Sequence, residues 1–405
     1  MGLPNVPRQL NAPDMLASLA EITDEPPGLT RTFLSPASER AKVLVGAWMR
    51  DAGLEVFEDK VGNLIGRRTC ADPEAPVVAC GSHLDTVRDA GRFDGAVGIV
   101  AGIVAASDLG AVALPYHLEV VAFSDEEGVR FQSTYLGSRF YAGDDSVLIS
   151  GVRDAGGITT SEAVASHTPS FPSPPPRRLV AYIEAHIEQG PVLEKEALSL
   201  GAVTAIAGQT RLRINLDGTA GHAGTTPMLH RRDALAGAAE GIVFLEQLAR
   251  ESPGMVATVG CLDLRSPASN VIPGFASFSV DIRHADDAIR ASFVNLAISG
   301  LRSRATSRDL KIEVLTLLNS PAVLCDPPMT ALVAKAISKN QNACPRLTSG
   351  AGHDAVAVSA RARVAMIFVR CQDGVSHHPD EYSSVEDISA AIRVLTEFLR
   401  EFRPE

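Results

Sequence analysis

The sequence is poor in the features that mark several large classes of protein. Only six of its 405 residues are cysteine and no two form a CxxC pair, which excludes a disulfide-framed domain and a zinc site built on thiolates. Lys and Arg number 37 against 48 Asp and Glu, a net charge of −11, so most of the surface would repel nucleic acid and anionic membranes. No window reaches the roughly 18 apolar residues of a membrane span, and residues 1–9 lack the pattern of a secretory signal. We therefore expect a cytoplasmic protein without nucleic-acid or membrane partners, in which any metal is held by His and carboxylates.

The chain is long enough to form two hydrophobic cores. A single core stops growing at about 250–300 residues, and this chain has 405, of which 45% are hydrophobic and 21% charged. This composition is ordinary for a globular enzyme. Two domains are therefore the expectation.

The two ends of the chain share an alternation of strand-like and helix-like segments. This alternation is typical of a layered α/β domain with a parallel or mixed sheet. The expected helices are 14–24, 38–52 and 328–339, and the expected strands are 55–58, 61–65, 77–80, 118–123 and 364–369.

The middle of the chain has a different pattern. From about residue 208 a strand alternates between apolar and polar residues, as in a sheet with one wet face. A helix at 233–249, strands at 257–262 and 276–281, a helix near 285–304 and a strand at 311–315 complete a β-α-β-β-α-β order, which predicts a ferredoxin-like sandwich. We predict a catalytic α/β domain at 1–207 and 326–405, interrupted by an inserted α+β domain at 208–325.

The motif GSHLDTV at 81–87 follows the apolar strand expected at 77–80, and a second motif, GRFDG, follows at 91–95. His83 and Asp85 are expected at the carboxyl end of that strand, where open α/β sheets place their chemistry, and Asp94 near a helix start. Imidazole and carboxylate hold divalent metals, and a carboxylate beside a ligating His commonly orients it. The alternative is a solvated His with ordinary turn aspartates.

Glu126 and Glu127 follow the strand 118–123 in the same way. One carboxylate can bind a metal while its neighbour takes a proton from water, whose pKa the metal lowers. The alternative is that both are solvated acids. That alternative is weakened because His186 and His377 occupy loop positions comparable to those of Glu126 and Glu127, so further metal ligands are available.

Three residues of the inserted segment are candidates for substrate contacts. His222, in a Gly-rich turn, could donate to a carbonyl oxygen as charge develops, although such a His is often structural. Asn270 and Arg283 could hold a substrate carboxylate, since Arg offers a planar fork of donors. Without such a substrate, Arg283 would be a surface residue.

Taken together, nine motifs resemble the amidohydrolase branch of the M20 metallopeptidase-like family. That branch includes allantoate amidohydrolases, N-carbamoyl-L-amino acid hydrolases and β-ureidopropionases. The match runs in order from about residue 40 to the C-terminus through GSHLDTV, GRFDGAVG, SDEEGVRFQSTYLGS, EAHIEQGPVLE, GHAGTTPM, ASNVIPG, DIR, SGAGHDA and GVSHHP.

The resemblance implies two divalent metal ions per subunit, Zn²⁺ or Mn²⁺. His83, Asp94 and His186 match the ligands of one ion, and Asp94, Glu127 and His377 match those of the other, with Asp94 bridging. His186 is diagnostic of the branch, because the similar peptidase branch has an acidic residue there. In the last motif relatives have Ser-His-Asn-Pro where this chain has His377 followed by His378, so we predict His377, with His378 as the alternative.

The resemblance also implies roles around the metals. Asp85 matches the residue that orients His83, and Glu126 matches the general base. The positions that match substrate contacts are Gln209, His222, Asn270, Arg283 and the backbone around Gly350 and Ala351. His222 and Asn270 are expected to reach across a homodimer, so that the inserted domain serves as lid and dimerisation domain.

The substrate predicted from the resemblance is allantoate, hydrolysed to ureidoglycine, ammonia and carbon dioxide. The motif at 81–87 and the residues at 89–91 and 127–134 look most like allantoate amidohydrolases, whereas a carbamoylase would more often have Asp-Ser in place of Asp85-Thr86. An N-carbamoyl-L-amino acid hydrolase or a β-ureidopropionase is the alternative. A catalytically inactive metal-binding scaffold would lack a ligand or the base, and none is missing.

Overall fold

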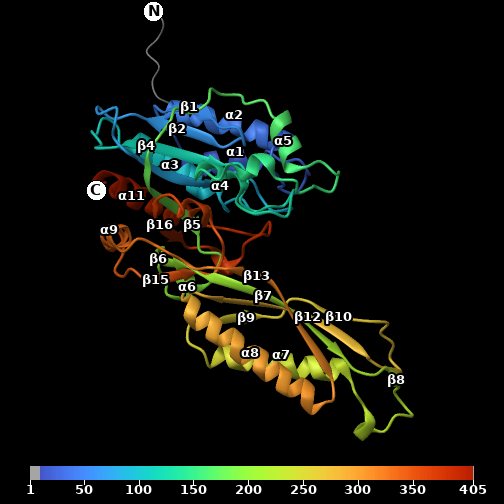
Figure 1. Cartoon of the computed structure of the whole chain (residues 1–405). Helices are drawn as coiled ribbons and strands as arrows, with labels where there is room; N and C mark the ends of the chain where they lie inside the picture. The colour runs from blue at the N-terminus through green and yellow to red at the C-terminus, as the bar shows by residue number, and fades with distance from the viewer. Residues whose placement is uncertain (1–9, 405) are drawn as a thin grey trace, which may run out of the picture. The chain divides into compact units, whose positions relative to one another are not determined.

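The computed structural model describes residues 10–404, and the chain divides into two compact units (Figure 1). The larger unit contains the chain up to Thr204 and again from Cys325, and the inserted unit is Ala205–Leu324. The expected boundaries, 207/208 and 325/326, lie three residues and one residue further along the chain. The prediction about a secretory signal concerns residues 1–9, which lie outside the described part. Within residues 10–404, no helix combines the length and the apolar character that a membrane crossing requires.

The larger unit is built on a nine-stranded mixed sheet. Its strands follow the order β1-β2-β4-β3-β5-β16-β6-β14, with β15 also pairing to β6. The central strands β4, β3, β5 and β16 are parallel, whereas β2 and β6 pair antiparallel at either side of them. The strands are β1 Glu55–Glu58, β2 Leu64–Arg68, β3 Val77–His83, β4 His117–Phe123, β5 Leu179–Ile187, β6 Leu200–Ile206, β14 Val323–Leu324, β15 Arg346–Ser349 and β16 Arg363–Val369.

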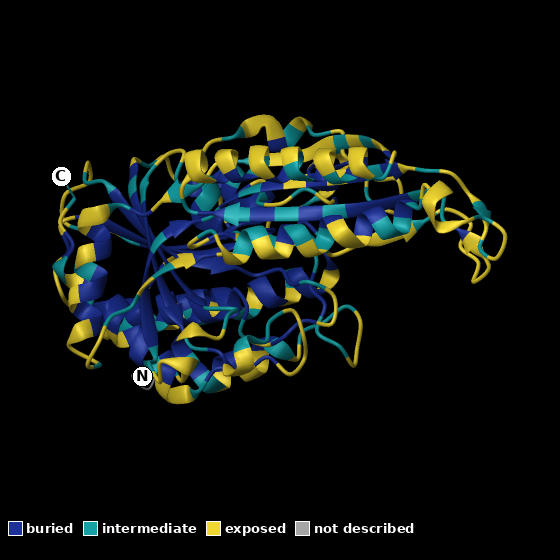
Figure 2. Cartoon of the chain, turned by 90° about the horizontal axis from the view of Figure 1, so that it is seen from below, coloured by how far each residue is buried: buried dark blue, intermediate teal, exposed yellow. Residues whose placement is uncertain are grey.

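Helix α3 (Ala96–Asp108) is the central helix of the larger unit, because it contacts β3, β4 and β5 as well as α1 and α11. It is apolar on nearly all sides, as expected for a helix enclosed by a core. At Gly98 a Cβ would lie 2.5 Å from the carbonyl oxygen of Ala185, so glycine permits the close approach to β5. The strands of this core are dark blue in Figure 2. The other helices are α1 Ala12–Ala20, α2 Pro36–Asp51, α4 Leu136–Tyr141, α5 Thr160–Ser166, α6 Val192–Lys195, α9 Pro327–Ser338, α10 Asp354–Val358 and α11 Val385–Glu401.

The inserted unit has the ferredoxin-like order that the sequence predicts, β7-α7-β9/β10-β12-α8-β13. All its strand pairs are antiparallel, in the sheet order β10-β12-β7-β13 with β9 also on β12. Leu212 and Ile214 of β7 are buried in one core with residues of both helices, whereas Arg211 and Arg213 are exposed on the other face. The elements are β7 Gly208–Asp217, α7 Ala234–Arg250, β9 Val256–Thr258, β10 Leu262–Leu264, β12 Phe275–His284, α8 Asp287–Ser307 and β13 Lys311–Ser320; β8 Gly221–His222 and β11 Val271–Ile272 form a separate two-stranded sheet.

Two expected strands have different bounds. The strand expected at 61–65 is β2, which begins only at Leu64, because Asp59 accepts hydrogen bonds from the backbone of Val61 and Asn63 and holds a turn there. The strand expected at 257–262 is interrupted between β9 and β10. The five residues from Thr258 to Leu262 face four residues of β12, Phe278 to Asp281, and such an extra residue disrupts a ladder.

Candidate metal centre and active site

The site forms where the parallel strands of the larger unit end. His83 is the last residue of β3, and the acidic motif, Glu126 and Glu127, follows β4. His186 is the penultimate residue of β5, and His377 lies in the loop after β16. Carboxyl ends of parallel strands meet at one edge of a sheet, so segments far apart in the chain become neighbours. The structure brings together all five side chains expected to bind metal.

Asp94 is the centre of this group. Its Oδ1 lies 3.1 Å from His186 Nε2 and 3.5 Å from His83 Nε2, and its Oδ2 lies 3.2 Å from His377 Nε2. His377 Nε2 is also 3.4 Å from Glu127 Oε1. Each carboxylate oxygen of Asp94 therefore faces a different set of side chains. The ligand atoms of His83, Asp94 and His186 lie within 4.8 Å of one another, as do those of Asp94, Glu127 and His377.

The two adjacent histidines of the last motif have different surroundings. His377 has a left-handed backbone conformation, φ 57°, and its ring lies beside Asp94 and Glu127. The His378 side chain is 60% exposed, and its Nδ1 lies 3.5 Å from Asp380 Oδ2. Of the two rings, the structure places His377 in the group.

Asp85 connects the first histidine with the acidic motif. Its carboxylate accepts hydrogen bonds from the backbone N–H groups of Glu126 (2.9 Å) and Glu127 (3.2 Å). His83 Nδ1 lies 2.9 Å from the backbone oxygen of Asp85 and 3.6 Å from its Oδ1. The backbone carbonyl of Asp85 thus makes the closer contact with the His83 ring, while its side chain fixes the loop that carries Glu126.

Burial and crowding set the charges of the acids. Burial raises the pKa of Glu126 well above its usual value, and the carboxylates of Glu127, Asp354 and Asp85 raise it further against the opposing effect of His83. Burial likewise raises the pKa of Glu127 to about 7. Asp94 is the exception.

Burial opposes the ionisation of Asp94, but the imidazoles of His186, His377 and His83 hold its pKa well below the usual range. The site therefore contains a carboxylate enclosed by imidazoles and, beside it, acids that lack a matching positive charge.

Sequence reasoning missed a second layer of side chains that holds Asp94. Glu381, which is buried, accepts hydrogen bonds from the backbone of Phe93 (2.9 Å) and Asp94 (3.0 Å) through Oε1 and from Ser376 Oγ (2.9 Å) through Oε2. Gln189 Nε2 donates to Asp94 Oδ2 (3.1 Å) and to Ser376 Oγ (3.0 Å). Gln189 lies within the motif EAHIEQGPVLE and Ser376 within GVSHHP. This position inside a motif was the only sign in the sequence that they belong to the site.

A buried polar pair behind His186 was also missed. The ring of His353 packs edge-on against His186 with centroids 4.4 Å apart, and its Nε2 lies 2.7 Å from Ser349 Oγ. Glu184 accepts hydrogen bonds from Ser82 Oγ (2.7 Å) and from the backbone of Ala355 (3.1 Å). Burial, and next the charge of His186, lower the pKa of His353 well below its usual value, so this ring is neutral.

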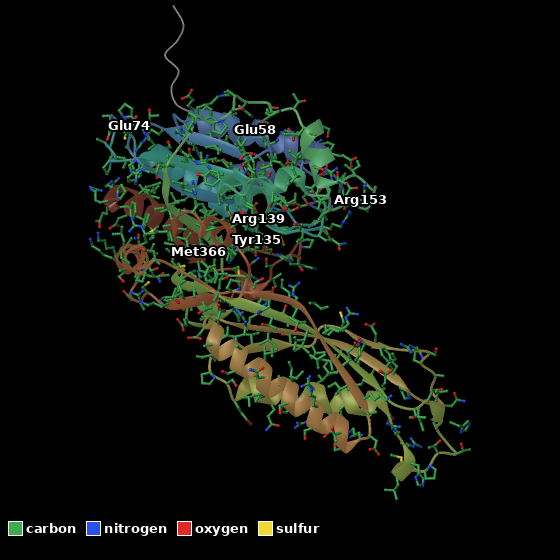
Figure 3. The ribbon with its side chains drawn as sticks, viewed as in Figure 1. Glu58, Glu74, Tyr135, Arg139, Arg153 and Met366 are labelled. Atoms are coloured by element: carbon green, nitrogen blue, oxygen red, sulfur yellow. The ribbon has the colours of Figure 1, made fainter. Side chains whose placement is uncertain are left out.

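The loop with Gly350 and Ala351 lies beside the segment that enters α4. Tyr135, labelled in Figure 3 with Arg139 of α4, has φ 64° and donates its backbone N–H to the carbonyl of Glu126 at 3.0 Å. A Cβ on Gly352 would lie only 1.9 Å from the Tyr135 hydroxyl, so any larger residue there would displace the Tyr135 side chain. Ser349 Oγ donates to the carbonyl of Ala351 at 3.0 Å.

The predicted substrate contacts of the inserted unit fall into two groups. Gln209 and Arg283 are paired in register on β7 and β12. His222 and Asn270 lie beyond the opposite end of β7, where Ala223 N–H donates to the carbonyl of Asn270 and Gly224 N–H donates to His222 Nδ1. Asp217 lies eight positions after Gln209 along β7, which is about 26 Å in an extended strand. The structure does not bring the two groups together within one inserted unit.

Comparison with known proteins gives the site a family. Residues 79–401 match the family described as Peptidase family M20/M25/M40. Allantoate deiminase of Arabidopsis thaliana is 38% identical over 95% of this chain and 80% of its own length. N-carbamoyl-L-amino acid amidohydrolase of Geobacillus stearothermophilus is 39% identical over 94% of this chain and 95% of its own length. A solved amidase of the hydantoinase/carbamoylase family from Burkholderia multivorans superposes with a TM-score of 0.92 at 32% identity, covering 98% of this chain and 99% of that one. The chain therefore belongs to the M20/M25/M40 peptidase family.

Proposed function

We propose that this protein is a two-metal amidohydrolase that hydrolyses the ureido group of a carboxylate-bearing substrate, with allantoate as the substrate. The products would be ureidoglycine, ammonia and carbon dioxide. The observation that carries the proposal is the arrangement around Asp94, with His83 and His186 at one carboxylate oxygen and His377 and Glu127 at the other.

The residues fit a pair of divalent cations. Asp94 Oδ1 is buried without a hydrogen bond, and crowded acids surround it, an arrangement that is unfavourable unless positive charge is supplied. His and carboxylate ligands suit Zn²⁺ and are also accepted by Mn²⁺. Two such ions, when bound, would polarise the ureido carbonyl and make the attacking water more acidic.

Glu126 is the residue proposed to move the proton. It would take a proton from the attacking water and pass it to the leaving nitrogen. Burial raises the pKa of Glu126 above its usual value, the direction that enzymes use to fit a carboxylate for proton transfer. The hydrogen bond from its backbone N–H to Asp85 fixes the loop that carries it. His222 would donate to the carbonyl oxygen as negative charge develops there.

Arg283, Gln209 and Asn270 would hold the substrate, together with the backbone around Gly350 and Ala351. Because about 26 Å of strand separates the Gln209 end of β7 from the His222 end, one inserted unit cannot place both groups on one small molecule. We propose that a second copy supplies His222 and Asn270, so that the active protein is a homodimer whose inserted domain is both lid and dimerisation domain. A cytoplasmic location stays a prediction.

The relatives support both the proposed substrate and its alternative. Matches of similar identity include an allantoate deiminase and an N-carbamoyl-L-amino acid amidohydrolase, so substrate choice needs a direct test. Purified protein loaded with Zn²⁺ or Mn²⁺ should release ammonia fastest from allantoate, compared with N-carbamoyl-L-amino acids and N-carbamoyl-β-alanine. Faster turnover of a carbamoyl amino acid would establish the alternative, and a full metal complement without turnover of any ureido substrate would leave a binding scaffold.

A further inference from the structure

One carboxylate in the inserted unit joins two of the predicted substrate contacts. Asp281 Oδ1 lies 2.8 Å from Arg283 Nε, and its Oδ2 accepts hydrogen bonds from Arg283 Nη2 (3.0 Å), Gln209 Nε2 (2.9 Å) and Arg211 Nε (3.0 Å). Burial raises the pKa of Asp281, but Arg283 and Arg211 lower it more, so the pKa is below its usual value. At neutral pH the group is a carboxylate with four donors.

The sheet fixes this arrangement. Asp281 and Arg283 are two residues apart on β12, so their side chains emerge on the same face, and the register places Gln209 opposite Arg283 and Arg211 opposite Asp281. Ile282, between the two, points into the core with both helices. At this point β12 is paired on both sides, with β7 and with β9, so the backbone under the cluster is held firmly.

The contact also decides which part of Arg283 can meet a substrate. A guanidinium is planar and binds a carboxylate through two parallel N–H groups. The Nε and Nη2 groups of Arg283 are directed at Asp281, which fixes the plane of the guanidinium. Asp281 therefore determines the orientation in which the guanidinium can meet a substrate carboxylate.

We infer that Asp281 is a positioning residue for substrate binding: it holds Arg283 and Gln209 in the orientation in which they take the substrate carboxylate. This inference rests on the proposed function, which makes Arg283 and Gln209 substrate contacts. Asp281 itself touches no substrate atom, because its carboxylate oxygens are directed at protein donors.

The test measures KM and kcat separately in the metal-loaded protein with the ureido acid that it turns over best. Asp281→Asn should raise KM about ten-fold or more, because a charged hydrogen bond is lost, and should change kcat less than about two-fold, since the metals and Glu126 are untouched. Asp281→Glu keeps the charge and should recover part of the loss in KM. Asp263→Asn is the control, since it removes an exposed carboxylate from the same sheet.

A double-mutant cycle separates positioning from a general structural effect. In an Arg283→Ala background, adding Asp281→Asn should raise KM less than about two-fold, because the residue it positions is absent. An equal rise in both backgrounds, or an unchanged KM in Asp281→Asn, would overturn the inference. If Asp281→Asn does not fold, the same cycle with Asp281→Glu decides. An Arg283→Ala protein with unchanged KM would instead refute the proposed carboxylate clamp.

Discussion

Removal of the Glu381 carboxyl group should weaken metal binding although this side chain is not among the proposed ligands. Its Oε1 accepts the backbone N–H groups of Phe93 and Asp94, and its Oε2 accepts Ser376 Oγ beside His377. One side chain therefore fixes both the turn that presents Asp94 and the loop that presents His377.

The magnitude follows from the hydrogen bonds. Glu381→Ala leaves the two backbone donors without their acceptor, and each such loss costs about 1–3 kcal/mol, so the folded state should lose about 3 kcal/mol. Glu381→Gln keeps one oxygen for both amides and removes the charge that burial and Asp94 disfavour, so it should lose about 1 kcal/mol. Loss of such supporting contacts typically lowers metal affinity about 10–100-fold, with Ala at the upper end.

The assay is a competitive chelator titration for metal affinity, with the urea midpoint of the metal-free protein recorded beside it. Asp380→Asn is the matched control, because it removes a neighbouring carboxylate that is 85% exposed. If Glu381→Ala and Glu381→Gln behaved alike, the two backbone hydrogen bonds would not be the cause. If both bound metal like the unaltered protein, the reasoning would be refuted.

Three further outcomes are expected. Glu126→Gln should keep its metal content and lose turnover about 10³-fold, as for removal of a general base; retained ammonia release would exclude Glu126. Chelation should abolish turnover and lower the melting temperature, both restored by Zn²⁺ or Mn²⁺, because bound ions stabilise the folded state; activity without detectable metal would contradict this. Glu58→Gln (Glu58 is labelled in Figure 3) should destabilise by about 3 kcal/mol at pH 7 because it leaves Lys42 and His167 with a neutral partner. Burial raises the pKa of Glu58, but His167 and Lys42 lower it by more, so the pKa is below its usual value and the charged form stabilises the fold. The difference in unfolding free energy between the two proteins should therefore shrink below about pH 4.3. Urea unfolding at several pH values measures this difference, and a difference that did not change with pH would contradict the prediction.

The place of the site could be predicted because its residues stand beside the clearest local patterns in the chain. Buried parallel strands are continuous apolar runs, as at 77–80 and 118–123, and the charged residues that follow them are easily seen. Strand ends at one edge of a sheet then bring His83 and Glu127 into one group. The order of strands and helices in the inserted unit was predictable from a different pattern, the alternation of buried and exposed residues along strands such as β7.

The residues that hold these side chains leave no such pattern. Glu381 meets the backbone of Asp94 across 287 residues of chain, and Gln189 meets its carboxylate across 95. No periodicity relates residues so far apart, since only the folded sheet makes them neighbours. A polar side chain that orients another is therefore visible in the sequence only as a polar residue near a motif.

Asp281 and Arg283 show how a strand end decides what a charged residue can do. A strand expected to end at 281 would place Arg283 in a loop with no fixed direction, but β12 continues to His284. The cause is that β7 and β9 both pair with this part of β12, which local sequence cannot report. Side chains alternate along a strand, so the three added residues place Asp281 and Arg283 on the same face of β12. Arg283, which the sequence alone would place on the surface, is therefore ion-paired with Asp281, and this pair fixes the plane of its guanidinium.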